Sequence, residues 1–293
     1  MFRKLYLMRF ITILLFALLM YGPSLAQSNF VIEGQVVNQE TGDPIAYANV
    51  GIPGKYIGVA TNQKGVFTLK LPAGTASDTL QISTIGFTTK TLKVSVFNEQ
   101  NNQTVALQPK TYELNSITVS DTEDWETEWI GKKIKPVLSA AYGRSYSKKN
   151  IRATYAFKVQ WDKSLPLRIL HTRMYLKENH NDGRVKLRCR IMNVDSKTGL
   201  PDEDLMDYNI TGSAKDRGWV TCDFLDKDIY IDESSFFVVF EWLRESSKVV
   251  EQPVAAMFGI GIFFDSEVYV RDHALGRWKK NPNDIIYSVK VEY

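Results

Sequence analysis

The sequence predicts an all-β protein made of a small two-sheet β-sandwich followed by a larger antiparallel one. From residue 30 onward, apolar and polar residues alternate in short segments, and Gly, Pro and Asn separate these segments at turns. No ten-residue helical pattern stands between consecutive strands, which argues against a parallel sheet with crossover helices. With 44% hydrophobic and 24% charged residues, the 293-residue chain has a globular composition, which excludes a disordered protein.

Residues 1–26 have the pattern of a signal peptide. Three basic and no acidic residues lie at positions 1–9, an apolar run follows at 10–20, and a small-x-small site ends at Ala26. The run is shorter than the ~20 residues of a membrane-spanning helix. We therefore expect cleavage after Ala26, export, and a mature chain that starts at Gln27 and has no transmembrane helix.

Cleavage would leave the chain electrically neutral. The whole sequence has 36 Lys and Arg against 33 Asp and Glu, and removal of the three basic residues of the signal peptide leaves 33 of each. A neutral chain lacks the positive charge that binds nucleic acid or an anionic membrane surface. Nucleic acid and an anionic membrane surface are therefore not expected partners. The signal peptide predicts an exported location: periplasmic, associated with an outer membrane, or extracellular.

The mature chain divides into three segments. A first sandwich is expected at 27–119, a linker at 120–147 and a second sandwich at 148–293. The linker changes from acidic to basic, and Gly131 and Pro136 interrupt any long helix. The strands expected in the first sandwich are 30–38, 46–52, 66–71, 79–83, 88–96, 104–107 and 116–119. Those expected in the second are 151–161, 167–176, 185–194, 218–225, 236–243, 257–264, 267–272 and 285–293.

Several motifs follow one another in a specific order in the first segment. They are Ile-Glu-Gly-Gln-Val at 32–36, Thr-Gly-Asp-Pro-Ile at 41–45, a glycine-rich hairpin at 58–69, and Leu-Gln-Ile-Ser-Thr-Ile-Gly-Phe at 80–87. This order resembles the carboxypeptidase-regulatory-like domain, a transthyretin-like sandwich. In that family the domain occurs beside zinc carboxypeptidases, in front of TonB-dependent outer-membrane receptors, and as an accessory module of exported Gram-negative proteins. The second segment looks, more loosely, like a jelly-roll module of exported bacterial proteins.

Two of these family contexts conflict with the sequence. A zinc carboxypeptidase would need Glu three residues after a His, and none of the three His residues has one: the residues at that offset are Met174, Gly183 and Gly276. A receptor barrel needs many more strands than the about 170 residues after Val119 can supply. The accessory module of an exported protein is the context that remains.

Three acids around a Gly and Pro turn are a candidate Ca²⁺ site. Asp195, Asp202 and Asp204 could bring together the oxygen ligands that calcium requires. Lys197 stands where a further ligand would be expected, so the alternative is a solvated acidic loop.

Cys189 and Cys222 are a disulfide candidate. Both alternate with apolar neighbours, so both side chains are expected to face a core. An oxidising compartment would permit a bridge between them, and buried free thiols are the alternative. Neither cysteine has an adjacent His that would lower its pKa, so neither is expected to act as a nucleophile.

Aromatic residues could form a platform for a sugar. Trp278, beside Arg277, Lys279 and Lys280, is predicted to be the most exposed of the six Trp rings and is the ligand-binding candidate. Most of the other Trp rings are expected in the core.

The alternating segment 285–293 ends on an aromatic residue, as strands of small outer-membrane barrels do.

These features predict an exported, non-enzymatic protein of the Gram-negative envelope that acts as a binding or structural module. The first domain would be a spacer or a docking unit, and the partner an envelope protein or a glycan. The alternatives are a carbohydrate-binding protein, a glycoside hydrolase that pairs Glu241 with a second acid, and a small outer-membrane barrel. No catalytic residue and no cofactor is predicted.

Overall fold

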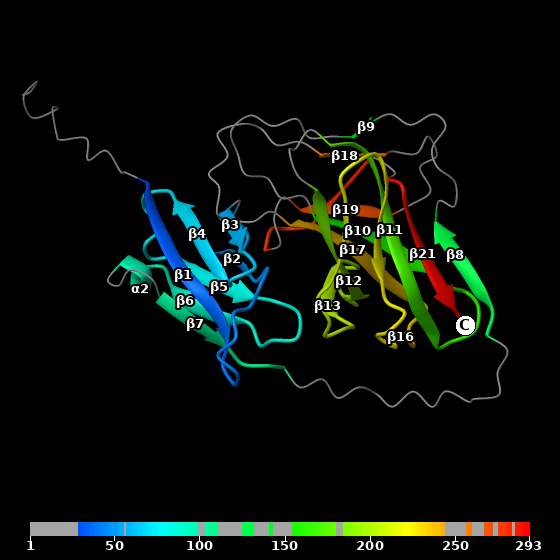
Figure 1. Ribbon diagram of the computed structural model, residues 1–293, viewed down its shortest axis with the longest axis horizontal. Helices are drawn as coiled ribbons and strands as arrows, with labels where there is room; N and C mark the ends of the chain where they lie inside the picture. The colour runs from blue at the N-terminus through cyan, green and yellow to red at the C-terminus, as the bar shows by residue number, and fades with distance from the viewer. Residues whose placement is uncertain are drawn as a thin grey trace, which may run out of the picture.

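The predicted all-β architecture is confirmed: the described residues form two β-sandwiches, one after the other along the chain (Figure 1). The computed structural model describes residues 29–55, 57–98, 103–110, 125–131, 141–142, 154–179, 184–243, 256–259, 267–271, 275–282 and 285–293. Within these ranges, no helix is long and apolar enough to cross a membrane. The predicted cleavage site after Ala26 lies outside the described residues.

The first sandwich has a three-stranded sheet, β4-β1-β7, and a four-stranded sheet, β3-β2-β5-β6. Its elements are β1 (Phe30–Asn38), β2 (Asn49–Ile52), β3 (Ile57–Ala60), β4 (Val66–Leu71), β5 (Thr79–Ser83), β6 (Lys90–Lys93), α2 (Ser95–Asn98) and β7 (Gln103–Leu107). The observed bounds of β1, β4 and β5 coincide with the predicted ones. The strand predicted at 88–96 is shorter, because the chain turns into α2 after β6. The strand predicted at 116–119 lies outside the described residues.

Alternating side chains fill the core of the first sandwich. In β4, Phe67, Leu69 and Leu71 are buried while the residues between them are at least partly exposed. These side chains meet Ile32 and Val36 of β1 in one apolar cluster. In this sheet β1 pairs antiparallel with β4 and parallel with β7. Period-two burial is what strands with one solvated face require.

The second sandwich consists of two seven-stranded sheets. We call the first the β12 sheet; its strand order is β13-β12-β17-β10-β19-β20, and β14 also pairs with β12. We call the second the β11 sheet; its strand order is β8-β21-β11-β18-β9, and β15 and β16 also pair with β11. The strands are β8 (Thr127–Gly131), β9 (Ala141–Tyr142), β10 (Thr154–Gln160), β11 (Leu167–Asn179), β12 (Val185–Val194), β13 (Pro201–Asp204), β14 (Ile210–Ala214), β15 (Gly218–Asp223), β16 (Tyr230–Ile231), β17 (Ser235–Leu243), β18 (Ala256–Gly259), β19 (Val268–Arg271), β20 (Lys279–Lys280) and β21 (Tyr287–Glu292).

The segment predicted as a linker, 120–147, contributes strands to the second sandwich. Within it, β8 pairs antiparallel with the C-terminal strand β21, and β9 pairs with β18. Trp129 packs its ring against Arg173 on the outer face of the β11 sheet, and Ile130 packs against the core. The linker prediction was wrong for these residues because a five-residue edge strand is too short to give a clear period.

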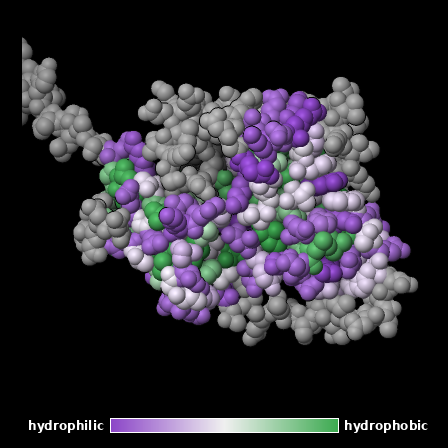
Figure 2. All heavy atoms as spheres, viewed as in Figure 1, coloured by the Kyte–Doolittle hydropathy of each residue, from purple (hydrophilic) through white to green (hydrophobic). Residues whose placement is uncertain are grey.

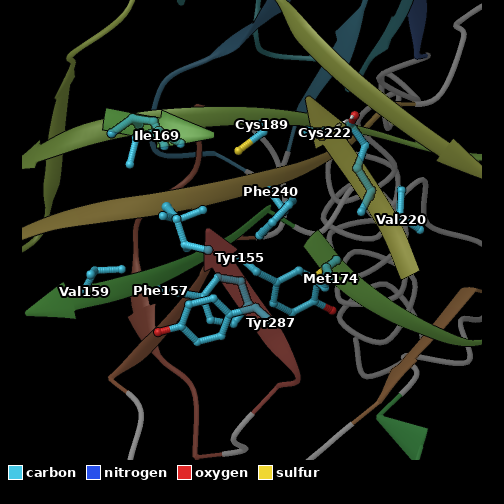
Figure 3. Close-up of a cluster of buried hydrophobic side chains, with 14 of the residues drawn as sticks. Tyr155, Phe157, Val159, Ile169, Met174, Cys189, Val220, Cys222, Phe240 and Tyr287 are labelled. Atoms are coloured by element: carbon cyan, nitrogen blue, oxygen red, sulfur yellow. Dashed lines mark hydrogen bonds between the residues drawn. The ribbon is translucent and has the colours of Figure 1, made fainter. Parts of the chain in front are cut away.

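Large aromatic side chains from both sheets fill the second core (Figure 3). Phe157 of β10 and Tyr287 of β21 stack with ring centroids 4.1 Å apart. Cys189 of the β12 sheet and Cys222 of the β11 sheet are both buried in this core, and both are free thiols. The disulfide candidate is therefore not formed, and the alternative of two buried free thiols is the one observed. Burial, followed by the neighbouring Cys222 thiol, raises the pKa of Cys189 well above its ordinary value.

The centre of the β12 sheet is buried on both faces. Phe236, Val238 and Phe240 of β17 point into the core, whereas Phe237 and Val239 belong to a separate apolar cluster on the opposite face. A sheet face that faced only solvent would be polar at these positions. The outer face of the β12 sheet is therefore covered, and it carries the residues described next.

Candidate functional site

A row of polar side chains crosses the outer face of the β12 sheet. Arg188 of β12 is opposite Glu241 of β17, Glu241 is opposite Thr154 of β10, and Thr154 is opposite Arg271 of β19. Because directly paired residues point to the same side of a sheet, all four side chains lie on one face. Their exposed fractions are only 0% for Arg188, 1% for Glu241, 0% for Thr154 and 9% for Arg271. We call these four residues the buried polar row.

Two ion pairs hold one end of this face. Nη2 of Arg188 lies 2.6 Å from Oε2 of Glu241, and Nε of the same guanidinium lies 3.1 Å from that oxygen. In the neighbouring pair, Nε of Arg190 lies 2.7 Å from Oδ1 of Asp204, and Nη2 of Arg190 lies 2.7 Å from Oδ2 of the same carboxylate. This side-on fork is the strongest geometry of an arginine with a carboxylate.

Glu241 is held in its ionised form. Burial by itself raises the pKa of this carboxyl group. The positive charges of Arg188 and Arg190 outweigh the burial, with the hydrogen bond from Arg188 adding to them, and the pKa lies below its ordinary value. Glu241 is thus a permanent counter-ion and not a proton donor near neutral pH.

Arg271 stands at the other end of the row without an acidic partner among the described residues. Its Nε and Nη2 atoms are buried and have no hydrogen-bond partner, and the same holds for Oγ1 of Thr154. The guanidinium lies over the ring of Trp278, 4.2 Å from its centroid. Burial, followed by repulsion from Arg190, lowers the pKa of Arg271 to about 9.

The first domain docks against the Arg188 end of this face through Tyr47. The backbone oxygen of Tyr47 accepts a hydrogen bond of 2.8 Å from Nη1 of Arg188. The hydroxyl of Tyr47 accepts one of 2.7 Å from Nζ of Lys186, and this ammonium also lies 4.6 Å from the centroid of the Tyr47 ring. Tyr47 adopts φ = 61°, an uncommon conformation for a residue other than glycine. Such strain persists only where the surrounding contacts impose it.

Two further turns of the first domain approach the second domain. The amide of Gly54, in the turn between β2 and β3, donates a 3.1 Å hydrogen bond to the backbone oxygen of Leu275. Gly86 follows β5, and a Cβ atom built there would lie 2.9 Å from the backbone oxygen of Asp207. Figure 1 shows β2 and β3 on the side of the first domain that faces the β12 sheet. The three turns form one docking surface.

The outer face of the β11 sheet carries a different arrangement, a ladder of rings and cations. The guanidinium of Arg173 lies between two indoles, 3.8 Å from the centroid of Trp129 and 4.2 Å from that of Trp219. The ring of His171 stacks on the far side of Trp129 at 6.4 Å, and Tyr175 meets Trp219 edge-on at 5.2 Å. Cation–π contacts of this kind fix the ring planes relative to one another. We call these five residues the aromatic ladder.

The described surface on the side viewed in Figure 1 is mostly hydrophilic. Figure 2 shows hydrophilic side chains over both domains, with the hydrophobic side chains gathered in separate patches.

The structure places Trp278 differently from the prediction. The ring is half-buried and packs against the outer apolar cluster of the β12 sheet, with one face over Arg271. Trp278 is thus no more than half-buried, as Trp125, Trp129 and Trp219 are. Neighbouring cations in the sequence do not determine whether a side chain folds onto the sheet. Trp278 instead takes part in the environment of the buried polar row.

The three acids of the candidate Ca²⁺ site do not converge. Oδ1 of Asp195 accepts hydrogen bonds from the backbone amides of Lys197 and Thr198, and so closes its own turn. Asp204 is bound by Arg190, and Asp202 is exposed. No group of three or more His, Cys, Asp or Glu that could hold a metal ion occurs within the described ranges. The structure therefore does not bring these three carboxylates together, and the alternative of a solvated acidic loop fits Asp195 and Asp202.

Sequence reasoning missed most of the buried polar row. Lys186, Arg188 and Arg190 alternate with apolar residues along β12, a pattern that is typical of a solvated strand face. The first domain covers part of this face through Tyr47, which only the tertiary structure reveals. A usable signal was the run of β17, where apolar residues occupy both faces around Glu241.

Comparison with known proteins identifies the first domain. Residues 32–119 match the family model described as the CarboxypepD_reg-like domain. No curated protein sequence matches the chain. A chain from the "Structure of infectious bursal disease virus Gx strain" is 12% identical, with 90% of this chain and 74% of that chain covered at a TM-score of 0.26, a likeness too low to carry an argument. The segment 32–119 of this protein is a CarboxypepD_reg-like domain.

Proposed function

We propose that this protein is an exported, non-enzymatic module of a Gram-negative cell envelope, in which the CarboxypepD_reg-like domain is a docking unit that covers one face of the second sandwich. The observation that carries this proposal is the hydrogen bond from the buried Arg188 guanidinium to the backbone oxygen of Tyr47. If the first domain were only a spacer, the connecting chain would be the only link between the two domains. Here a charged side chain of one domain depends on the other domain for a hydrogen bond.

The state of the buried carboxylates supports a binding or structural role. A glycoside hydrolase needs one carboxyl group with a raised pKa as a proton donor and a second carboxylate free to act on the sugar. The pKa of Glu241 is lowered, and both Glu241 and Asp204 are engaged by arginines. The geometry therefore favours ion pairs that hold the sheet and the docked domain over an acid and base pair.

A matched pair of glycine variants tests the docking. Gly86 and Gly54 both have positive φ, so replacement by Ala costs both of them backbone strain. Only at Gly86 would the new Cβ meet the backbone of the second domain, because at Gly54 the nearest atom is the flexible Arg277 side chain at 3.6 Å. We expect Gly86→Ala to expand the particle in small-angle scattering and Gly54→Ala to leave it unchanged. Equal scattering profiles for both variants and the wild type would argue against a docked first domain.

Export is tested by the N-terminus of the protein recovered from cells. Expression of the whole chain in a Gram-negative host, followed by fractionation and N-terminal sequencing, should give an envelope fraction that begins at Gln27. A matched variant with Ala26→Arg should remain unprocessed, because the cleavage site requires a small residue there. Recovery of the unprocessed wild type from the cytoplasm would contradict the proposal.

The aromatic ladder supports carbohydrate binding as a second candidate function. It displays half-buried rings from β8 and β15 across the outer face of the β11 sheet, and sugars stack on such rings. Titration with soluble envelope and plant polysaccharides should then give a saturable change in tryptophan fluorescence that is lost in Trp219→Ala. Flat titrations across these glycans would remove this candidate.

A further inference from the structure

The charges on the outer face of the β12 sheet do not cancel. Three guanidinium groups, those of Arg188, Arg190 and Arg271, share this face with two carboxylates, Glu241 and Asp204. Each carboxylate is already bound by its own arginine. Of these three guanidinium groups, that of Arg271 is the one without an acid at ion-pair distance among the described residues, and it is nine-tenths buried. A buried charge without a counter-ion costs several kcal/mol of folding free energy, so a compensating negative charge is favoured there.

We propose that Arg271 and Thr154 form a binding site for an oxyanion, a carboxylate or phosphate group carried by the ligand of this protein. Nε and Nη2 of Arg271 lie on one edge of the guanidinium, which is the edge that binds two oxygens of a carboxylate or phosphate side by side. Both of these atoms are buried and have no hydrogen-bond partner in the structure.

Thr154 supplies a third donor at the same place. It is the direct neighbour of Arg271 in the pairing of β10 with β19, so its side chain lies on the same face. Its Oγ1 is buried and is also without a partner. Three unsatisfied donors on two paired residues, one of which is charged, match an acceptor that is itself charged.

Trp278 fixes the orientation of the site. Its ring covers one face of the Arg271 guanidinium at 4.2 Å, a cation–π contact that leaves the edge of the group to bind a ligand. The segment that carries Trp278 also accepts the hydrogen bond from Gly54 at Leu275. This segment therefore contacts the proposed site through Trp278 and the first domain through Leu275.

This ligand chemistry rests on the binding role proposed above. The two can nevertheless fail separately, since the docking and export experiments measure particle size and processing, whereas the oxyanion site is measured by ligand-dependent stability of the purified chain.

The test compares the melting temperature of the whole protein in sodium acetate, sodium phosphate and sodium chloride at equal ionic strength and pH. A ligand that binds only the folded state raises the melting temperature in a saturable way. We expect a rise in acetate, in phosphate or in both relative to chloride. The arm with the larger rise identifies the source as a carboxylate or a phosphate.

Arg271→Met, which removes the charge but keeps a similar shape, should abolish this rise. Thr154→Val should weaken the apparent affinity several-fold, because one of three donors is lost. Lys280→Met is the matched control: it removes an exposed positive charge from the neighbouring strand β20 and should behave as the wild type does. Equal anion responses in the wild type and Arg271→Met would overturn the proposal, as would the absence of any response in the wild type.

The melting temperature without added oxyanion gives a second readout. Because Arg271 forms no ion pair with an acid among the described residues, Arg271→Met should melt in chloride at the same temperature as the wild type or higher. A marked decrease in chloride would mean that Arg271 stabilises the fold by itself, and this result would also contradict the proposal.

Discussion

The guanidinium of Arg188 binds Oε2 of Glu241 at 2.6 Å and the backbone oxygen of Tyr47 at 2.8 Å. One buried side chain thus joins β12, β17 and the first domain. Since Glu241 is 1% exposed, its charge has no access to water that could replace Arg188. The stability of the second sandwich and the docking of the first domain are therefore linked through this residue.

Removal of either member of this pair alone should be costly. We expect Arg188→Met to lower the free energy of unfolding by about 3–5 kcal/mol, because it leaves the Glu241 charge buried without a partner. The double variant Arg188→Met with Glu241→Leu should recover much of this loss, because no isolated charge remains. Urea denaturation measures both values. A double variant that is less stable than Arg188→Met would contradict the assignment of the loss to an unpaired charge.

The lowered pKa of Glu241 predicts a loss of stability in acid. A carboxyl group whose folded pKa lies below its unfolded value contributes stability above the unfolded pKa, and this stability disappears as the pH falls through the folded pKa. The free energy of unfolding should therefore decrease below about pH 4.5, the ordinary value for Glu. Glu241→Gln should be less stable than the wild type at pH 7 but should lose less stability on acidification. Parallel curves for the two proteins would rule out a contribution from Glu241.

The two cysteines should be unreactive until the protein unfolds. Both are buried, and burial keeps Cys189 in its protonated, non-nucleophilic form. Iodoacetamide should give no adduct with the native protein and two adducts after denaturation without a reductant, as counted by mass spectrometry. A denatured protein that gains no adduct until it is reduced would instead carry the disulfide that the structure lacks.

The contribution of the aromatic ladder to the free energy of unfolding depends on the planar shape of the Arg173 guanidinium. Its guanidinium lies within 4.2 Å of two ring centroids, and each such contact at a partly exposed site contributes about 0.5–1 kcal/mol. Arg173→Met should therefore lower the free energy of unfolding by about 1–2 kcal/mol. Arg173→Lys keeps the charge but cannot stack between two rings, so it should recover only part of this loss. If Arg173→Lys had the same free energy of unfolding as the wild type, the positive charge alone and not the planar shape would account for the stabilisation.

Strands with regular alternation could be predicted to the residue. The bounds of β1, β4, β5 and β12 agree with the sequence, because apolar and polar residues alternate along most of each strand. The strand β3 was missed, since its four residues include a glycine and give no period. The strands β8, β13 and β14 were missed for a similar reason: each holds only one or two core-facing side chains at an edge of its sheet.

The candidate site could not be predicted in the same way. Its row is assembled from β12, β17, β10 and β19, which come from distant parts of the sequence and whose pairing no local pattern specifies. The charged residues that alternate along β12 are typical of a solvent-exposed strand face, whereas Tyr47 and the neighbouring turns of the first domain cover this face. A charge that is hidden by another domain has the same sequence pattern as one that faces solvent.

The docked arrangement of the two domains is tested most directly by a double-mutant cycle across their contact. Tyr47→Phe removes the hydroxyl that accepts the 2.7 Å hydrogen bond, and Lys186→Met removes its donor. With the domains docked, the two changes should be coupled by about 1 kcal/mol in the free energy of unfolding. Strict additivity of the two single changes, with no coupling energy, would mean that Tyr47 and Lys186 do not meet in solution and would contradict the docking.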